Sequence, residues 1–227
     1  MLKIGKIDYL NLLPFDIYLK KSSLSFQQKK MITYRKSYPA KLNSDFLFSR
    51  LDGGFVSSIM ALGKKNITTN IGIIAKGEVW SVIVLPKENQ DDYQSATSNA
   101  LAKVLKVSGE VRIGDRALHY KIQGGEYQDL GLLWWKKHRL PFVFGLFCLK
   151  KRSEKIQSML EGFSRTKPKI PYYILIQSSY SSKIPPKEIR AYLQKIYYAL
   201  KSKEKRALEH FHRELRILGI KKPKRIE

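Results

Sequence analysis

Hydroxyl and amide side chains stand where predicted strands end and helices begin. Ser57 and Ser58 follow a short apolar strand and open a helix. Thr97 and Ser98 open a second helix, and Asn11 follows the first strand. The first turn of a helix presents unpaired N–H groups and the positive end of the helix dipole, so two such turns facing across a cleft would suit a dicarboxylate. The same residue types also cap helices for structural reasons, and the pattern alone leaves that interpretation open.

Other groups that commonly carry catalysis are scarce. The single cysteine, Cys148, lies in an apolar run that is typical of core packing. His210 and His212 point to different faces of a helix, while His119 and His138 lack Cys or carboxylate partners at metal-binding spacing. The sequence also lacks a glycine-rich phosphate loop and a nucleophile elbow. We therefore expect chemistry without a metal ion or an organic cofactor.

The elements that position these residues alternate between strands and helices, as in a parallel sheet covered by helices. Apolar runs predict strands at residues 2–7, 30–35, 54–56, 71–75, 79–85, 111–113 and 142–149. Periodicity and capping residues predict helices at residues 14–20, 40–51 and 116–120, with others that begin at residues 57, 97 and 129. We predict that the strand at 142–149 is the last, and that helices follow at 153–163, 171–179, 186–200 and 203–218.

The middle of the chain is predicted to be an insertion. Residues 87–140 carry a net charge of only +2, against +8 for residues 1–86 and +14 for residues 141–227. The strands at 79–85 and 142–149 bracket this segment, and we expect them to lie side by side as two connections between lobes. The sequence therefore predicts an α/β protein with one lobe from residues 1–86 and 141–227, a second lobe from residues 87–140, and a ligand-binding cleft between them.

The charge of the chain bears on its partners. Its 227 residues have a formal net charge of +24, which could attract nucleic acid or small anions. Lysines and arginines alternate with glutamates along the predicted helices, and no nucleic-acid motif accompanies them, so we favour a solvated basic face over a specific nucleic-acid interface. No run approaches the roughly 18 apolar residues of a membrane span, and the first residues lack signal-peptide features. We expect a cytoplasmic protein.

Six sequence motifs resemble those of the chorismate dehydratase family in order and approximate spacing. They are KIDYLNLLPF at residues 6–15, FVSSI at 55–59, SATSNAL at 95–101, IGDRAL at 113–118, DLG at 129–131 followed by Trp135, and LPFVF at 140–144. This family opens the futalosine route to menaquinone. The resemblance implies a two-lobed fold like that of periplasmic binding proteins of the second type, with two linking strands and a helical C-terminal region.

The resemblance also implies a reaction, the loss of water from chorismate to give 3-[(1-carboxyvinyl)oxy]benzoate. On this basis we expect Ser57 and Ser58 to bind one carboxylate of chorismate, and Thr97 and Ser98 the other. Asn11 would donate a hydrogen bond to the departing hydroxyl group. The base would be the substrate's own enolpyruvyl carboxylate, and no cofactor would be required.

The segment at residues 77–81 and two residues of the motifs, Asp115 and Tyr9, need separate comment. Where the family often has Gly-Pro-Val-x-Ser, this chain has GEVWS, so Glu78 and Trp80 alter the local turn while Ser81 is retained as a substrate-binding candidate. Asp115 could act in the cleft or cap the short helix that follows it. Tyr9 could face the cleft or pack in the core.

Three alternative functions compete with this interpretation. The implied fold also serves non-catalytic solute-binding proteins, although these require export and the chain shows no signal peptide. A sister enzyme of the same pathway, which forms a naphthoate, shares the fold, but the IGDRAL motif favours the dehydratase. Nucleic-acid binding by the basic C-terminal helices is the third alternative.

Overall fold

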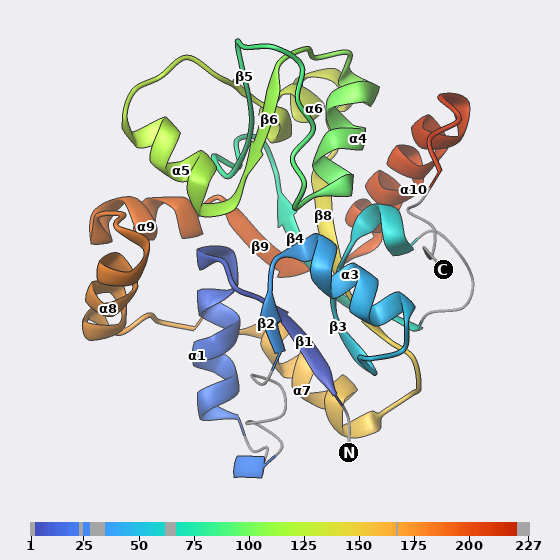
Figure 1. Cartoon of the computed structure of the whole chain (residues 1–227). Helices are drawn as coiled ribbons and strands as arrows, with labels where there is room; N and C mark the ends of the chain where they lie inside the picture. Colours follow the sequence, from blue (N-terminus) through green and yellow to red (C-terminus); the bar gives the residue numbers. More distant parts are fainter. Residues whose placement is uncertain (1–2, 23–24, 28–34, 62–66, 167, 222–227) are drawn as a thin grey trace.

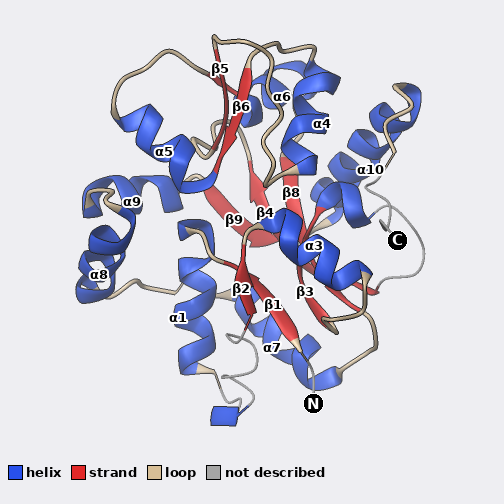
Figure 2. Cartoon of the chain, in the orientation of Figure 1, coloured by secondary structure: helices blue, strands red, loops and turns tan. Residues whose placement is uncertain are grey.

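Two β-sheets of different size organise the structure, a computed structural model that describes all residues except 1–2, 23–24, 28–34, 62–66, 167 and 222–227 (Figure 1). The described strands of the large sheet follow the order β2 (Arg35–Ser37), β1 (Ile4–Ile7), β3 (Gly53–Ser57), β8 (Phe142–Leu149), β4 (Ile67–Ala75) and β9 (Ile196–Ala199). Those of the small sheet follow the order β6 (Glu110–Ile113), β5 (Val82–Leu85) and β7 (Gln128–Asp129). Figure 2 shows the small sheet above the large one, with helices around both.

The central strands of the large sheet are apolar because both of their faces are covered. Every residue of β1 and of β3 is buried, and β1 runs parallel to β2 and β3. β8 runs antiparallel between β3 and β4. A Cβ at Gly54 would lie 2.5 Å from the carbonyl oxygen of Gly5, and the φ of Gly54 is 149°, so only glycine allows this close pairing of β1 and β3.

The helices divide between the two sheets (Figure 1). On the large-sheet side lie α1 (Leu13–Lys21), α3 (Pro39–Leu47), α7 (Glu154–Arg165), α8 (Tyr172–Ser182), α9 (Pro186–Leu193) and α10 (Ser202–Ile217), with the short 3-10 helices η1 (Leu10–Leu12) and η2 (Ser58–Ala61). On the small-sheet side lie α4 (Ala96–Leu105), α5 (Gly114–Ile122) and α6 (Leu130–His138).

Two caps show how the sequence starts the helices of the small-sheet side. The Ser95 side chain accepts a hydrogen bond from the backbone N–H of Ser98, so Ser95 caps α4. The sequence had predicted Thr97 and Ser98 as the capping residues. The Asp129 carboxylate caps α6 by accepting from the N–H of Leu132 at 2.9 Å. Each cap satisfies backbone donors that the first helical turn leaves unpaired.

The chain crosses between the sheets differently from the prediction. The strands at 79–85 and 142–149 do not pair: β8 pairs with β3 and β4, whereas β5 lies at the centre of the small sheet. The connections are therefore the short segments between β4 and β5 and between α6 and β8. β5 forms part of the small sheet although it precedes residue 87, where the second lobe was predicted to begin.

The C-terminal region contains a strand where a continuous helix was predicted. Helix α9 ends at Leu193, and β9 then pairs antiparallel with β4, with Ile196 opposite Ala75. Ile and Tyr favour extended backbone, and the open edge of β4 supplies hydrogen-bond partners, so tertiary context overrides the helical pattern. The strand predicted at residues 30–35 lies outside the described residues except for Arg35, where β2 begins.

One buried apolar cluster extends through both sheets. It includes Phe15 and Phe147 from the large-sheet side and Leu101 and Trp134 from the small-sheet side, each at most 1% exposed. Cys148 is also fully buried in this cluster, as its apolar run predicted. Within the described part of the chain, no helix is long and apolar enough to cross a membrane.

Candidate active site

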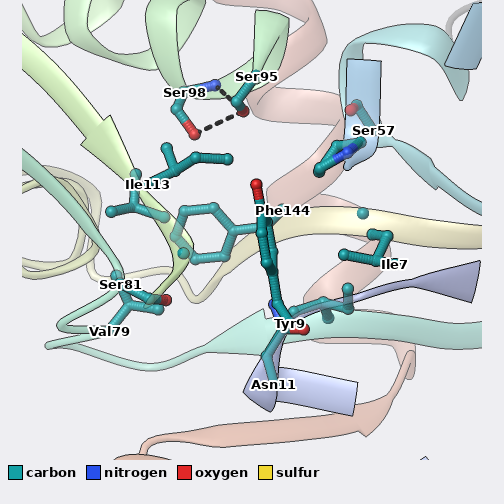
Figure 3. A pocket seen from close by; sticks show the side chains of 15 residues that line it. Ile7, Tyr9, Asn11, Ser57, Val79, Ser81, Ser95, Ser98, Ile113 and Phe144 are labelled. Atoms are coloured by element: carbon teal, nitrogen blue, oxygen red, sulfur yellow. Dashed lines mark hydrogen bonds between the residues drawn. The ribbon is translucent and has the colours of Figure 1, made fainter. Parts of the chain in front are cut away.

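A cavity between the two sheets gathers most of the predicted site residues (Figure 3). Asn11, Ser57, Ser81 and Ser98 all line it. Its other lining residues are Ile7, Tyr9, Pro39, Ile73, Val79, Val82, Ser95, Ile113, Gly114, Phe144 and Gly145. The cavity volume is about 50 Å³, well below the roughly 300–1,000 Å³ of small-molecule sites. The free space in the cavity is therefore narrower than a bound small molecule requires.

Ser57 reaches the cavity from the end of β3 and is held from behind by Asn43. The Asn43 amide donates to Ser57 Oγ at 2.8 Å, and its carbonyl oxygen accepts from the Ser57 backbone N–H at 2.9 Å. Because the amide nitrogen can only donate, Ser57 Oγ acts as acceptor in this bond and its own proton is left for the cavity. Asn43, on α3, is 4% exposed and was not predicted as a site residue.

Ser98 reaches the cavity from the opposite side, together with Ser95 at the start of α4. Figure 3 shows these two side chains across the cavity from Ser57. The Ser95 and Ser98 Oγ atoms lie 2.8 Å apart, and Ser95 Oγ also accepts from the Ser98 backbone N–H. α4 is a ten-residue helix, so its N-terminus adds a positive dipole end to these hydroxyls. By contrast, η2 after Ser57 has four residues and contributes little dipole.

Ser58 and Thr97 lie behind the cavity and do not line it. Both are at most 1% exposed. Their hydroxyl oxygens lie 3.5 Å apart, and Thr97 Oγ1 accepts from the backbone N–H of Ile59 at 3.2 Å. In this arrangement the two residues join η2 to α4 and hold the two sides of the cavity together.

Asn11 enters the cavity from η1, directly after β1. Its side-chain oxygen is buried and has no hydrogen-bond partner among the described residues. Its backbone carbonyl accepts a hydrogen bond from the hydroxyl of Tyr198 on β9. Since a buried amide oxygen without a partner costs free energy, its presence at a cavity wall suits a residue that completes its hydrogen bonds with a ligand.

Ser81 sits in the first connection between the sheets, whose turn is fixed by Asp129. The Asp129 carboxylate accepts from the backbone N–H of Val79 at 3.0 Å and of Trp80 at 2.7 Å. Trp80 has a φ of 63°. Glu78, the departure noted in the sequence, turns away from the cavity and pairs with Lys195 at 3.1 Å. Glu78 and Trp80 therefore leave Ser81 in the cavity wall.

Tyr9 links the two sides at the cavity. Its hydroxyl donates to the side-chain oxygen of Gln94, which also accepts from Arg116 at 3.1 Å. Arg116 in turn forms an ion pair with the buried carboxylate of Asp92 at 2.7 Å. Burial raises the pKa of Tyr9 well above its ordinary value, so the phenol stays protonated. Tyr9 lies against Gly114, where an added Cβ would be 2.9 Å from the ring.

Asp115 neither caps its own helix nor lines the cavity. The residue before α5, Ile113, holds the N-cap position without a side-chain cap, and Asp115 Oδ1 instead faces the backbone N–H of Leu10 at 3.4 Å. Burial raises the pKa of Asp115 to about 6, against a smaller lowering by the Leu10 N–H. Asp115 thus connects α5 to η1 beside the Asn11 site.

The cavity wall is neutral and rich in hydroxyl groups. None of its described lining residues carries a side chain that is charged at pH 7. Lys6, the lysine of the first motif, is 3% exposed and forms its ion pair with Asp16 outside the cavity wall. Such a wall can bind anionic groups through uncharged donors and can orient a reactive molecule, but its described residues include no carboxylate, imidazole or amine to act as a general base.

Comparison with known proteins identifies the family. A family described as menaquinone biosynthesis matches residues 2–112 and 98–216. Chorismate dehydratase from Campylobacter jejuni is 43% identical over 219 residues, which cover 95% of this chain and 98% of that protein. The chain belongs to the menaquinone biosynthesis family. The resemblance to the chorismate dehydratase family, seen in the six motifs of this family member, is therefore confirmed.

Solved structures confirm the fold of this family member. A protein from Archaeoglobus fulgidus matches with a TM-score of 0.65 at 13% identity, covering 96% of this chain and 98% of its own. The alkanesulfonate-binding protein of Xanthomonas axonopodis pv. citri matches with a TM-score of 0.58 at 13% identity, covering 99% and 95%. An ABC transporter protein from Parabacteroides distasonis matches with a TM-score of 0.61 at 14% identity, covering 99% of this chain and 96% of its own. The predicted α/β fold of the periplasmic-binding-protein type is therefore correct.

Proposed function

We propose that this chain is a hydro-lyase that removes water from chorismate to give 3-[(1-carboxyvinyl)oxy]benzoate. The observation that carries this proposal is the 43% identity to a chorismate dehydratase along nearly the whole chain. The geometry agrees with it, because the motif residues Asn11, Ser57, Ser81 and Ser98 converge on one cavity. The family description supports a role in menaquinone synthesis, and we propose the futalosine route as its context.

The reaction asks for orientation and charge stabilisation more than for a strong nucleophile. The hydrogen at C3 of chorismate is acidic because its carbon is conjugated through the diene to the ring carboxylate. Breaking the C3–H bond sends its electron pair into an extended enolate on that carboxylate. The C4–O bond then breaks, the electron pair returns to the ring, and the ring becomes aromatic. Aromatisation supplies the driving force.

The two carboxylates of chorismate would be held from opposite sides of the cavity. On the large-sheet side, the Ser57 proton is free to donate into the cavity because Asn43 donates to the Ser57 oxygen from behind. On the small-sheet side, Ser98 and the N-terminus of α4 offer a second set of donors. Ser58 and Thr97, buried behind these groups, would act by holding η2 against α4.

Asn11 would act on the departing hydroxyl group. Its amide nitrogen can donate to the C4 oxygen as negative charge grows there, an interaction strongest in the transition state. Its unpartnered side-chain oxygen could accept from the same hydroxyl group in the bound substrate. Asp115 would support this site indirectly, through the η1 backbone at Leu10.

The substrate would supply its own base. The described lining residues include no carboxylate, imidazole or amine, whereas the enolpyruvyl carboxylate is attached through oxygen to the reacting C3. This carboxylate takes the proton from C3. It then passes that proton to the hydroxide that leaves C4, so that water is released. Serine donors would fix the carboxylate in the conformation that reaches C3.

Incubation of the purified chain with chorismate tests the proposed function. We expect ¹H NMR to show the alkene signals of the ring replaced by aromatic signals, and mass spectrometry to show a product lighter by one water. Saturable binding of chorismate without any turnover would instead indicate a non-catalytic binding protein. Neither binding nor turnover would reject chorismate as the ligand.

A further inference from the structure

Tyr192 contacts the cavity wall from behind, at Ser81. Its hydroxyl donates to Ser81 Oγ at 2.9 Å, across a separation of 111 residues in sequence. Tyr192 lies in α9 on the large-sheet side, whereas Ser81 lies in the first connection to the small sheet. Tyr192 is 1% exposed and Ser81 is 3% exposed, so water does not compete strongly for either hydroxyl.

The phenol of Tyr192 donates its proton in a hydrogen bond to Ser81 Oγ. Burial raises the pKa of Tyr192 far above its ordinary value, so the phenol keeps its proton. Within the described part of the chain, the Tyr192 hydroxyl forms its hydrogen bond with Ser81 Oγ. A buried hydroxyl that donated to nothing would carry a desolvation penalty, so the proton points at Ser81 Oγ.

This bond determines where the Ser81 proton goes. A serine hydroxyl has one proton and two lone pairs, and one lone pair of Ser81 Oγ is occupied by Tyr192. The backbone of Ser81 is also fixed, because its N–H donates to the Val79 carbonyl at 2.7 Å and its carbonyl accepts from the Gly114 N–H at 2.8 Å. Ser81 also lines the cavity. Its free proton can therefore be directed into the cavity, where it would meet a ligand oxygen.

We propose that Tyr192 is a positioning residue that holds Ser81 as a hydrogen-bond donor to an anionic oxygen of the bound substrate. This inference rests on the proposed function. Without the phenol, the Ser81 proton could turn toward other acceptors, and the cavity would lose a preorganised donor. Because the carboxylates of chorismate are charged both before and during the reaction, the effect falls on binding more than on the chemical step.

A double-mutant cycle of Tyr192→Phe and Ser81→Ala tests this inference. We expect Tyr192→Phe to raise KM for chorismate by about tenfold, and to change kcat by less than about threefold. In the Ser81→Ala background, Tyr192→Phe should have no further effect on KM, since the phenol acts through that hydroxyl. The dissociation constant of the product, which keeps both carboxylates, should rise by the same factor and gives a readout that needs no turnover.

Tyr197→Phe provides a matched control. The Tyr197 hydroxyl donates to Glu204 at 3.0 Å and does not contact the cavity, so this variant should keep the wild-type KM. If Tyr192→Phe does not fold, comparison of the double variant with Ser81→Ala still shows whether the phenol affects KM by a route other than the Ser81 hydroxyl, because the double variant leaves neither partner of the bond unpaired. Equal KM and product affinity in wild type and Tyr192→Phe would overturn the inference, as would a tenfold effect that persists without the Ser81 hydroxyl. A wild-type chain that neither converts chorismate nor binds the product would instead overturn the proposed function, and this inference with it.

Discussion

Asn43 and Ser57 form a reciprocal pair, in which each residue donates one hydrogen bond to the other at 2.8 and 2.9 Å. The pair connects α3 to the end of β3 and is buried, with both residues 4% exposed. It fixes the Ser57 backbone and occupies one lone pair of the Ser57 hydroxyl oxygen, so that the hydroxyl proton is left to donate elsewhere. The substrate binding proposed for Ser57 would therefore depend on a residue that does not line the cavity.

Asn43→Ala should weaken both stability and substrate binding. The variant leaves the buried Ser57 N–H without an acceptor, so we expect a loss of about 2 kcal/mol in the free energy of unfolding. KM should rise by about tenfold because the Ser57 hydroxyl is no longer oriented. Asn89→Ala is the matched control, since Asn89 accepts from the Gly109 N–H at 2.6 Å away from the cavity. Denaturant unfolding and steady-state kinetics measure both effects, and a normal KM in Asn43→Ala would rule out this role.

Asn11→Ala should act on the chemical step. Its amide nitrogen would donate to an oxygen whose negative charge grows only as the C4–O bond breaks, so kcat should fall by about 10²–10³. The lost hydrogen bond of the amide oxygen to the bound substrate should raise KM by a smaller factor. The Tyr198 hydroxyl binds the backbone carbonyl of Asn11, so the substitution leaves that anchor in place. Circular dichroism and product binding confirm that the variant is folded. A folded variant with near-normal kcat would assign the departing hydroxyl to another donor.

Gly114→Ala should disturb the contact between the two sides of the cavity. Gly114 has a φ of 64°, and a Cβ there would lie 2.9 Å from the Tyr9 ring. We expect kcat/KM to fall about tenfold or more as Tyr9 is displaced. Gly124→Ala separates strain from contact, because Gly124 has a φ of 78° with nothing within 4 Å of the added Cβ. That control should lose about 1 kcal/mol of stability but keep its activity. Equal kcat/KM in the two variants would show that the Tyr9 contact is unimportant.

Asp115 should make stability depend on pH in a specific direction. Its folded pKa of about 6 lies above the unfolded value of about 3.9, so the folded protein holds the proton more tightly. Its contribution is therefore most favourable below about pH 4, is lost as the pH rises to about 6, and stays constant above that. Asp115→Asn should be more stable than wild type by about 2 kcal/mol at pH 7.5 and equal to it near pH 4. Urea unfolding across this range checks the difference, and a gap that widens toward low pH would refute the assignment.

The sequence was sufficient for features that depend on local pattern. Continuous apolar runs predicted β3 and β8, and polar residues at strand ends and helix starts predicted Asn11, Ser57 and Ser98 in the cleft. The family resemblance added Ser81, and all four residues line the cavity. Strand β9 escaped prediction because Ile196–Ala199 becomes a strand only where the edge of β4 is available. The periodicity of a single segment carries no information about that edge.

The supporting residues of the site could not be predicted for a similar reason. Ser95 carried a local signal that was not used, because it is a capping residue type two positions before the predicted helix start at residue 97 and directly before the observed α4. Asn43 and Tyr192 carried none, since each acts on a serine that lies 14 or 111 residues away in sequence. Both sit on amphipathic helices where a polar or aromatic residue is unremarkable. Their importance follows only from the fold that places them behind the cavity.

Comparison of chorismate with its enolpyruvyl amide tests the central claim most directly, because the amide keeps the shape of the substrate and removes the proposed base. We expect the purified chain to convert chorismate to an aromatic product lighter by one water, as followed by ¹H NMR. The amide should compete with chorismate for the cavity and give no aromatic product. Aromatic product from the amide at a comparable rate would exclude the substrate carboxylate as the base, and the absence of product from chorismate itself would be incompatible with the proposed dehydratase.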